Sequence, residues 1–104
     1  MHENTQAVTV VASFHLRKEH LDAVLPAVTA CIKASRQEPT NLFYTCRRDL
    51  NDPLHLVFIE QWQSVAAIHE HEKQPHFLAM KAAFEKGMEG TPTVTMLEDV
   101  AAFS

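Results

Sequence analysis

The sequence contains only two glycines, Gly87 and Gly90, among its 104 residues. A dinucleotide-binding fingerprint and a phosphate-binding loop each need several glycines at fixed spacing. Nucleotide-dependent chemistry built on those loops is therefore excluded. Cysteine is equally scarce, because Cys31 and Cys46 are the only two. In a reducing compartment such a pair is most often a pair of buried thiols that behave as small apolar groups.

A basic surface and a long apolar run are also missing. Nine Lys and Arg residues are scattered along a chain whose net charge is -4, so nucleic acid is not an expected partner. No apolar segment approaches the roughly 20 residues of a membrane helix, and the first four residues, MHEN, lack the features of a signal peptide. We expect no membrane partner, a cytoplasmic location and, at this length, a single domain over residues 1–104.

The spacing of apolar residues predicts four strands and three helices. Strands show apolar side chains at every second position, whereas helices show them at intervals of three and four. The predicted strands cover residues 7–15, 42–49, 54–62 and 92–103, and the predicted helices cover residues 17–37, 65–73 and a segment that Pro75 opens and Gly87 and Gly90 close. Asn51-Asp52-Pro53 supplies the turn between the two middle strands, and Pro26 is expected to bend the first helix.

The order of these elements is typical of the α+β class. Strand, helix, strand, strand, two helices, strand is the order of a ferredoxin-like split βαβ sandwich, in which an antiparallel four-stranded sheet carries its helices on one face. The other face carries Val, Leu and Phe where a solvated face would alternate with polar residues. A second copy of the chain is the simplest cover for that face, so the sequence predicts a homodimer.

Seven histidines are many for this length, yet their spacing is poor for a metal. His69 and His71 lie about 200° apart around a helix, on opposite faces. The segment HEHEK has Lys73 where a zinc-protease motif needs its second histidine. His71 and His76 are five apart with a proline between them, and they would need help from a distant residue. We therefore expect no metal site.

Glu60, Trp62, His71 and His76 form the strongest cluster of polar and aromatic residues. Glu60 and Trp62 alternate onto one face of a strand, and His71 lies one helical turn beyond Ile68, at the border of the same space. A carboxylate, an indole and an imidazole can therefore line one pocket. The same pattern also fits simple packing, in which Trp62 is core, Glu60 pairs with an arginine or caps a helix, and His71 bonds a backbone carbonyl. The residues alone leave both interpretations open.

The segment FIEQWQSVAAIHEHEKQPHF, residues 58–77, resembles the signature of the antibiotic biosynthesis monooxygenase family. The matching residues are Glu60, Trp62, Ser64, Ala67, His71, Pro75, His76 and Phe77. Upstream, ASRQEPTNLFYTCRRDLNDP, residues 34–53, is similar to a second family segment, with Thr40 in place of the usual glycine. The resemblance spans nearly the whole chain and is specific for the family, but it does not specify a substrate.

The resemblance implies a small ferredoxin-like protein that forms a dimeric α/β barrel. Characterised members oxidise phenolic or quinol-like rings with dioxygen and use no flavin, metal or haem. The implied partners are therefore a small aromatic or quinol-like substrate and dioxygen, and no cofactor is expected. Some relatives degrade haem, but they carry a tryptophan where His71 stands and an asparagine on the first strand, so the resemblance to that branch is weaker.

The resemblance and the chemistry of oxygen together suggest roles for seven residues. A cofactor-free oxygenase must deprotonate its substrate, and histidine, with a pKa of roughly 6.5, is the residue best suited to that task near neutral pH. His71 is the first choice for the base, with His76 second and His15 third, and Glu60 orients or polarises the imidazole as a second catalytic group. The predicted substrate-binding residues are Trp62, Tyr44, His76, Phe77 and His15.

Two other functions remain open on the sequence. The first is an isomerase or other processing enzyme for a small phosphorylated metabolite, which requires a cation near the pocket, with Arg36, Arg47 or Arg48 as candidates. The second is a noncatalytic ligand-binding dimer, in which the family signature preserves packing alone. The three functions differ in what they require of the pocket: a base beside an apolar ring site, a cation, or a cavity too small for a ring.

Overall fold

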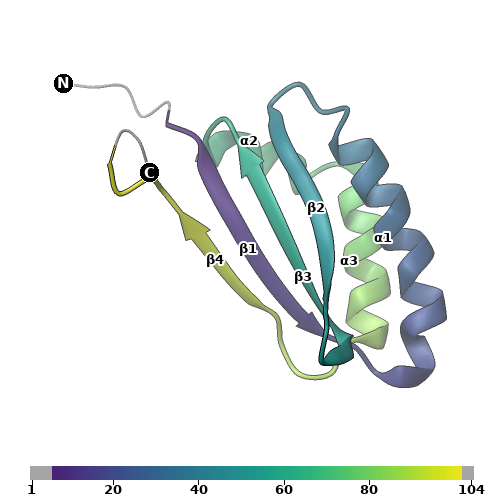
Figure 1. Cartoon of the computed structure of the whole chain (residues 1–104). Helices are drawn as coiled ribbons and strands as arrows, with labels where there is room; N and C mark the ends of the chain where they lie inside the picture. Colours follow the sequence, from purple (N-terminus) through teal and green to yellow (C-terminus); the bar gives the residue numbers. More distant parts are fainter. Residues whose placement is uncertain (1–5, 102–104) are drawn as a thin grey trace.

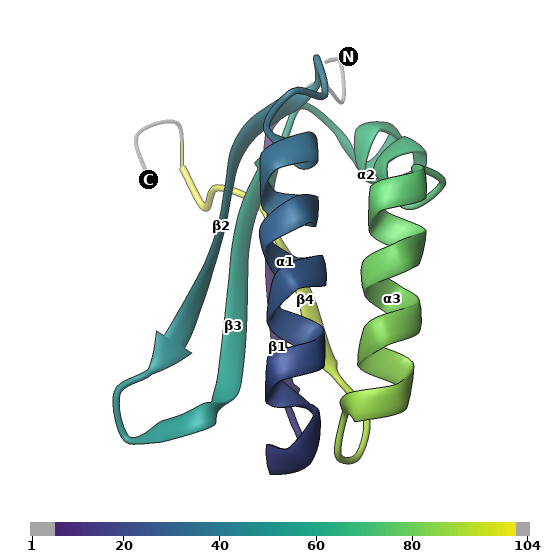
Figure 2. The same cartoon turned by 90° about the vertical axis from the view of Figure 1, so that its right-hand side faces the viewer.

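Four antiparallel strands form one sheet, and the helices cover only one of its two faces (Figures 1 and 2). The computed structural model describes residues 6–101. Its elements are β1 (Val8–His15), a 3-10 turn η1 (Lys18–His20), α1 (Leu21–Ser35), β2 (Asn41–Asp49), β3 (Asp52–Trp62), α2 (Val65–His71), α3 (Pro75–Gly87) and β4 (Thr93–Leu97). This arrangement confirms the predicted α+β ferredoxin-like fold.

The strands lie in the order β2-β3-β1-β4, so β1 and β3 form the centre of the sheet. They pair over their full common length, from Val8 opposite Trp62 to His15 opposite His55. Side chains of a strand alternate between the two faces, and on β1 it is Val10 and Ala12 that are buried beneath the helices. The intervening side chains of β1 therefore lie on the face that no helix covers.

The helix α1 packs against α3 over the sheet (Figure 2). It buries the apolar side chains of Val24, Val28 and Cys31 against the sheet and α3. It continues through Pro26 in its second turn. At the far end of α3, a Cβ on Gly87 would lie 2.7 Å from Cβ of His20. The close approach of α3 to η1 thus depends on the absence of a side chain there. None of the helices within residues 6–101 is long and apolar enough to cross a membrane.

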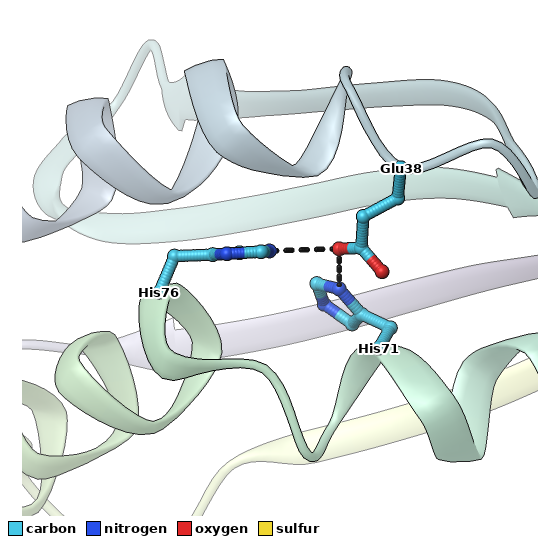
Figure 3. Close-up of side chains that lie close together, drawn as sticks. All are labelled: Glu38, His71 and His76. Atoms are coloured by element: carbon cyan, nitrogen blue, oxygen red, sulfur yellow. Dashed lines mark hydrogen bonds and ion pairs between the residues drawn. The ribbon is translucent and has the colours of Figure 1, made fainter.

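The short helix α2 and the start of α3 are set by local capping. The hydroxyl of Ser64 accepts a hydrogen bond of 3.1 Å from the backbone N–H of Ala67, which makes Ser64 the N-cap of α2. Pro75 occupies the first position of α3, where its missing N–H costs nothing. The two helix ends place His71 and His76 on either side of a three-residue turn, next to the turn that follows α1 (Figure 3).

Two predicted strand boundaries differ from the structure. The strand β3 begins at Asp52, so Pro53 lies inside it and the turn falls on Leu50 and Asn51. Proline is tolerated there because the pairing with β2 is already irregular between Arg48 and Asp49. The last strand ends at Leu97, which pairs with Thr9 near the start of β1, and residues 98–101 are not part of a strand. Residues 102 and 103, which were also predicted to be extended, lie outside the described chain.

Candidate active site

A cavity of about 270 Å³ lies between the sheet and the helices. Its walls are mainly apolar, with aromatic side chains from β1, β3 and α3. The apolar residues that enclose it include Val10, Phe14, Phe58, Phe77, Met80, Phe84, Val94 and Met96. Tyr44, Glu60 and His71 add polar groups to this lining, and Glu72, Lys81 and Glu85 add charged ones. An apolar enclosure with a few polar groups is the usual form of a small-molecule site.

Glu60 brings a carboxyl group into this apolar wall. It lies on the inward face of β3 and is only 8% exposed, and one of its oxygens accepts a hydrogen bond of 2.9 Å from the indole N–H of Trp62. Burial raises the pKa of Glu60 to about 7, against the opposing effect of the Trp62 bond, and the negative charges of Glu72 and Glu38 raise it further. Near neutral pH this group can therefore either accept or donate a proton.

His71 is the last residue of α2 and is 2% exposed. Its Nδ1 lies 2.6 Å from Oε2 of Glu38 (Figure 3). Because a carboxylate only accepts hydrogen bonds, Nδ1 is the donor, and in the neutral ring Nε2 then carries a free lone pair. Nε2 is buried and has no hydrogen-bond partner within residues 6–101. Burial lowers the pKa of His71, and the Glu38 bond opposes that change.

Glu38 is the functional residue that the sequence analysis missed. The same oxygen that binds His71 also lies 2.8 Å from Nε2 of His76, so one carboxylate oxygen joins two imidazoles (Figure 3). The prediction that Glu60 orients the imidazole was wrong, because the hydrogen bond of Glu60 goes to Trp62. Glu38 lies in the turn after α1, 33 residues before His71. No local spacing could reveal such a contact, and the only signal was its place in the EPT segment of the family resemblance.

Three aromatic side chains surround the imidazole of His71. The rings of Trp62, Phe77 and Tyr44 have centroids 4.4, 5.1 and 5.6 Å from that of His71. Tyr44 and Phe77 line the cavity, whereas Trp62 is fully buried and does not contribute to its lining. Trp62 therefore contacts His71 and Glu60 from outside the cavity lining. Burial also raises the pKa of Tyr44, so its phenol stays protonated and can only act as a neutral hydrogen-bonding group.

Two predicted substrate-binding histidines lie away from the cavity. His76, at the start of α3, is held by Glu38 and does not line the cavity. His15 is exposed on the uncovered face of the sheet, where its ring stacks on that of His55 with centroids 4.2 Å apart. His15 therefore does not line the cavity, because alternate side chains of β1 point to opposite faces. The other predicted site residues lie around the cavity and the ring of His71.

These features define the protein as a ferredoxin-like α+β domain with a small apolar pocket beside a buried Glu–His pair. The sequence model described as antibiotic biosynthesis monooxygenase matches residues 7–83. The chain belongs to the antibiotic biosynthesis monooxygenase family.

Solved structures agree with this assignment. One described as an antibiotic biosynthesis monooxygenase is 32% identical, covers 90% of this chain and 99% of its own, and superimposes with a TM-score of 0.87. Rv0793 from Mycobacterium tuberculosis is 26% identical over 94% of this chain and 99% of its own, with a TM-score of 0.85. PA3566 from Pseudomonas aeruginosa is 25% identical over 96% and 100%, also with a TM-score of 0.85. No curated protein sequence matches the chain.

The raised pKa of Glu60 predicts a pH-dependent loss of stability. The proton is bound more tightly in the folded state, so stability is full below the unfolded pKa of about 4.5 and falls as pH rises to about 7. The loss amounts to about 3 kcal/mol. We expect Glu60→Gln to be more stable than the wild type at pH 8 by up to this amount and similar to it at pH 4.5, as measured by urea unfolding. Glu89→Gln, an exposed control, should follow the wild type, and an E60Q difference that does not change with pH would contradict the assignment.

Proposed function

We propose that the protein is a cofactor-independent monooxygenase that oxidises a quinol or another small phenolic substrate with dioxygen. The observation that carries the proposal is the buried, unpartnered Nε2 of His71 in a residue that lines an apolar cavity. A buried polar atom without a partner costs about 1–3 kcal/mol. A substrate hydroxyl that donates a hydrogen bond to Nε2 would remove that cost, which explains why the fold retains the arrangement.

The size and lining of the cavity favour a compact aromatic substrate. Its volume of about 270 Å³ is close to the lower end of the range, roughly 300–1,000 Å³, of small-molecule sites. Phe77, Phe58 and Phe84 offer aromatic contact surfaces around it. An aromatic ring fits such walls, and its hydroxyl group finds His71 and Glu60 among the few polar groups of the lining.

The first chemical step is removal of the phenolic proton. Nε2 of His71 accepts the proton, and the carboxylate of Glu38 stabilises the imidazolium that forms through its bond to Nδ1. Because His71 is neutral before the reaction, it can act as the acceptor in the neutral pH range. The product of this step is an electron-rich aryloxide in a mainly apolar cavity, which is the form of the substrate that can donate an electron to dioxygen.

The later steps can be balanced with substrate and dioxygen alone. The aryloxide transfers an electron to dioxygen, and the two radicals combine to form a carbon–oxygen bond at the ring carbon beside the hydroxyl. His71 returns its proton to the distal oxygen, which gives a hydroperoxide. Loss of the hydrogen from that carbon and cleavage of the O–O bond release water and leave a hydroxyquinone. One quinol and one dioxygen thus give one hydroxyquinone and one water, and the quinol supplies all four electrons.

Glu60 is suited to the proton transfers that follow the first step. Its pKa of about 7 allows it to be protonated when the peroxide forms and ionised when the carbon-bound proton leaves. His71 and Glu60 would then act as a base and an acid whose pKa values burial moves in opposite directions, down for His71 and up for Glu60.

The phosphorylated-metabolite alternative has less support. Among the described residues, Lys81 is the one Lys or Arg that lines the cavity. Arg36 donates a hydrogen bond to the backbone carbonyl of Tyr44, and Arg47 and Arg48 do not line the cavity. A phosphate in this apolar space would lie next to the carboxyl group of Glu60, which is an unfavourable neighbour for an anion.

A noncatalytic ligand-binding role would not need the buried Nε2 of His71 to be free.

Oxygen uptake tests the proposal directly. We expect the wild-type protein, treated with a chelator, to consume one dioxygen per molecule of an accepted benzo- or naphthohydroquinone without added cofactor. His71→Gln should lower kcat by roughly 10²–10⁴-fold, the usual contribution of a general base. Glu38→Gln should lower kcat by up to roughly 10⁴-fold, the loss known for an orienting carboxylate. The measurement is an oxygen-electrode assay across a panel of hydroquinones.

His69→Gln is the matched control, since His69 is exposed on the same helix and should leave kcat unchanged. Turnover by His71→Gln at the wild-type rate would exclude His71 as the base. Oxygen uptake that occurs only after addition of a flavin or a metal ion would contradict the cofactor-independent mechanism.

The uncovered face of the sheet supports assembly as a homodimer. It carries the side chains of Val11, Val57 and Ile59 at its centre and Phe43 and Leu97, each 45% exposed, nearer its edges. Figure 1 shows that no helix lies on this side. A second copy of the same sheet would bury these residues, and the two sheets would enclose the dimeric α/β barrel that the sequence predicts.

A charge on this face should separate the two subunits. We expect the wild type to behave as a dimer in size-exclusion chromatography with light scattering, and Phe43→Glu to weaken the dimer by roughly 30-fold, because a charge replaces a large apolar side chain on the face that the second copy would cover. Leu50→Glu is the control, because Leu50 is fully exposed in the turn between β2 and β3. A monomeric wild type, or dissociation caused equally by Leu50→Glu, would contradict the proposed interface.

A further inference from the structure

Glu38, His71 and His76 come together from three separate parts of the chain. They lie in the turn after α1, at the end of α2 and at the start of α3, and each offers one ligand atom within 4.8 Å of the other two (Figure 3). We infer that these three side chains form a binding site for a divalent transition metal ion, with Zn²⁺ as the best fit. This site lies beside the proposed catalytic cavity, and the proposed oxidation does not require it.

The types of ligand atom define the class of ion. Two imidazole nitrogens and one carboxylate oxygen suit Zn²⁺, Cu²⁺, Ni²⁺ and Co²⁺, whereas Mg²⁺ and Ca²⁺ prefer ligand sets made only of oxygen. The two histidines that the sequence analysis left without a third ligand thus acquire one from a distant residue. His69, which also lies on α2, is exposed and does not belong to the cluster.

The present hydrogen bonds hold the ligand atoms almost where an ion needs them. Oε2 of Glu38 lies 2.6 Å from Nδ1 of His71 and 2.8 Å from Nε2 of His76. In a tetrahedral zinc site, with bonds of about 2.1 Å, neighbouring ligand atoms are about 3.4 Å apart. The two contacts of Glu38 therefore need to open by less than about 1 Å each. The ion then takes the place of the two hydrogen-bonding protons, and each neutral imidazole carries its one proton on its other ring nitrogen.

An ion and its water ligands can reach the cluster from solvent. The side chains of Glu38 and His76 are 13% and 18% exposed, whereas that of His71 is 3% exposed. The carboxylate contributes a negative charge that offsets part of the charge of the ion. Three protein ligands leave one tetrahedral position for water, the composition of an open zinc site.

The position of the site determines its effect on the cavity. Glu38 and His76 do not line the cavity, so an ion bound by them reaches a substrate only through the ring of His71. When Nδ1 coordinates the ion, the remaining ring proton resides on Nε2, which can then donate a hydrogen bond but cannot accept a proton. Metal binding should therefore inhibit a reaction in which His71 is the base. This consequence rests on the proposed function, whereas the metal site itself does not.

Binding of Co²⁺ and Zn²⁺ to the intact protein tests the site without any activity measurement. We expect one Zn²⁺ per chain by isothermal titration calorimetry and a visible absorption band when Co²⁺ is added. Glu38→Gln and His76→Ala should each weaken Zn²⁺ binding by at least tenfold and lower the Co²⁺ band. His69→Ala should bind both ions as the wild type does, and circular dichroism should show which variants remain folded.

The outcomes separate the metal site from the proposed function. Zn²⁺ binding that is unchanged in folded His76→Ala, that is lost in His69→Ala, or that is absent from the wild type would overturn the metal site. If Glu38→Gln does not fold, His76→Ala decides by itself, because His76 is partly exposed at a helix end. If Zn²⁺ binds the wild type as expected but leaves quinol oxidation unchanged, the metal site stands and the role of His71 as the base fails.

Discussion

The carboxylate of Glu38 bonded to the imidazole of His71 is the interaction on which the proposed chemistry depends. It joins the turn after α1 to the end of α2, and through His76 it also reaches the start of α3. The bond fixes which nitrogen of His71 carries the proton and leaves the other nitrogen free in the buried part of the site. The bond therefore fixes the orientation of the His71 ring relative to the turn that carries Glu38.

Burial changes the pKa values of the two titratable groups that line the cavity, His71 and Glu60. Removal from water disfavours charge, so burial lowers the pKa of His71 and raises that of Glu60. The pKa of Glu60, about 7, therefore lies well above the usual range of a carboxyl group. The hydrogen bonds that Glu38 accepts from His71 and that Glu60 accepts from Trp62 limit these changes, and the aromatic residues Trp62 and Tyr44 provide the low-polarity surroundings. The same aliphatic and aromatic packing that stabilises the sheet therefore also tunes the site.

Much of the fold could be predicted because its determinants are local. Alternation along β1 and β3 identified the central strands, and Ser64 and Pro75 marked the starts of α2 and α3. The shared face of Glu60 and Trp62 follows from the same alternation, and it placed the indole next to His71. The end of β4 was less predictable, because it depends on a long-range pairing with β1 that no local pattern reveals.

The site itself was only half predictable. His71 and Glu60 were chosen correctly as residues of one pocket, but the contact of Glu38 with His71 spans 33 positions and depends on how two turns meet in space. The role first given to Glu60 belongs to Glu38 for this reason. His15 was chosen because histidine can act as a base, but its position on β1 puts its side chain on the uncovered face, where it stacks on His55.

The protonation state of the His71 ring is the most direct test of this account. Long-range ¹H–¹⁵N correlation spectra of the uniformly labelled protein, recorded at pH 7.5 in metal-free buffer, distinguish the two neutral tautomers and the doubly protonated ring. The account predicts that His71 is neutral, with its proton on Nδ1 and a lone pair on Nε2. A proton on Nε2 alone, or a doubly protonated ring at this pH, would contradict it.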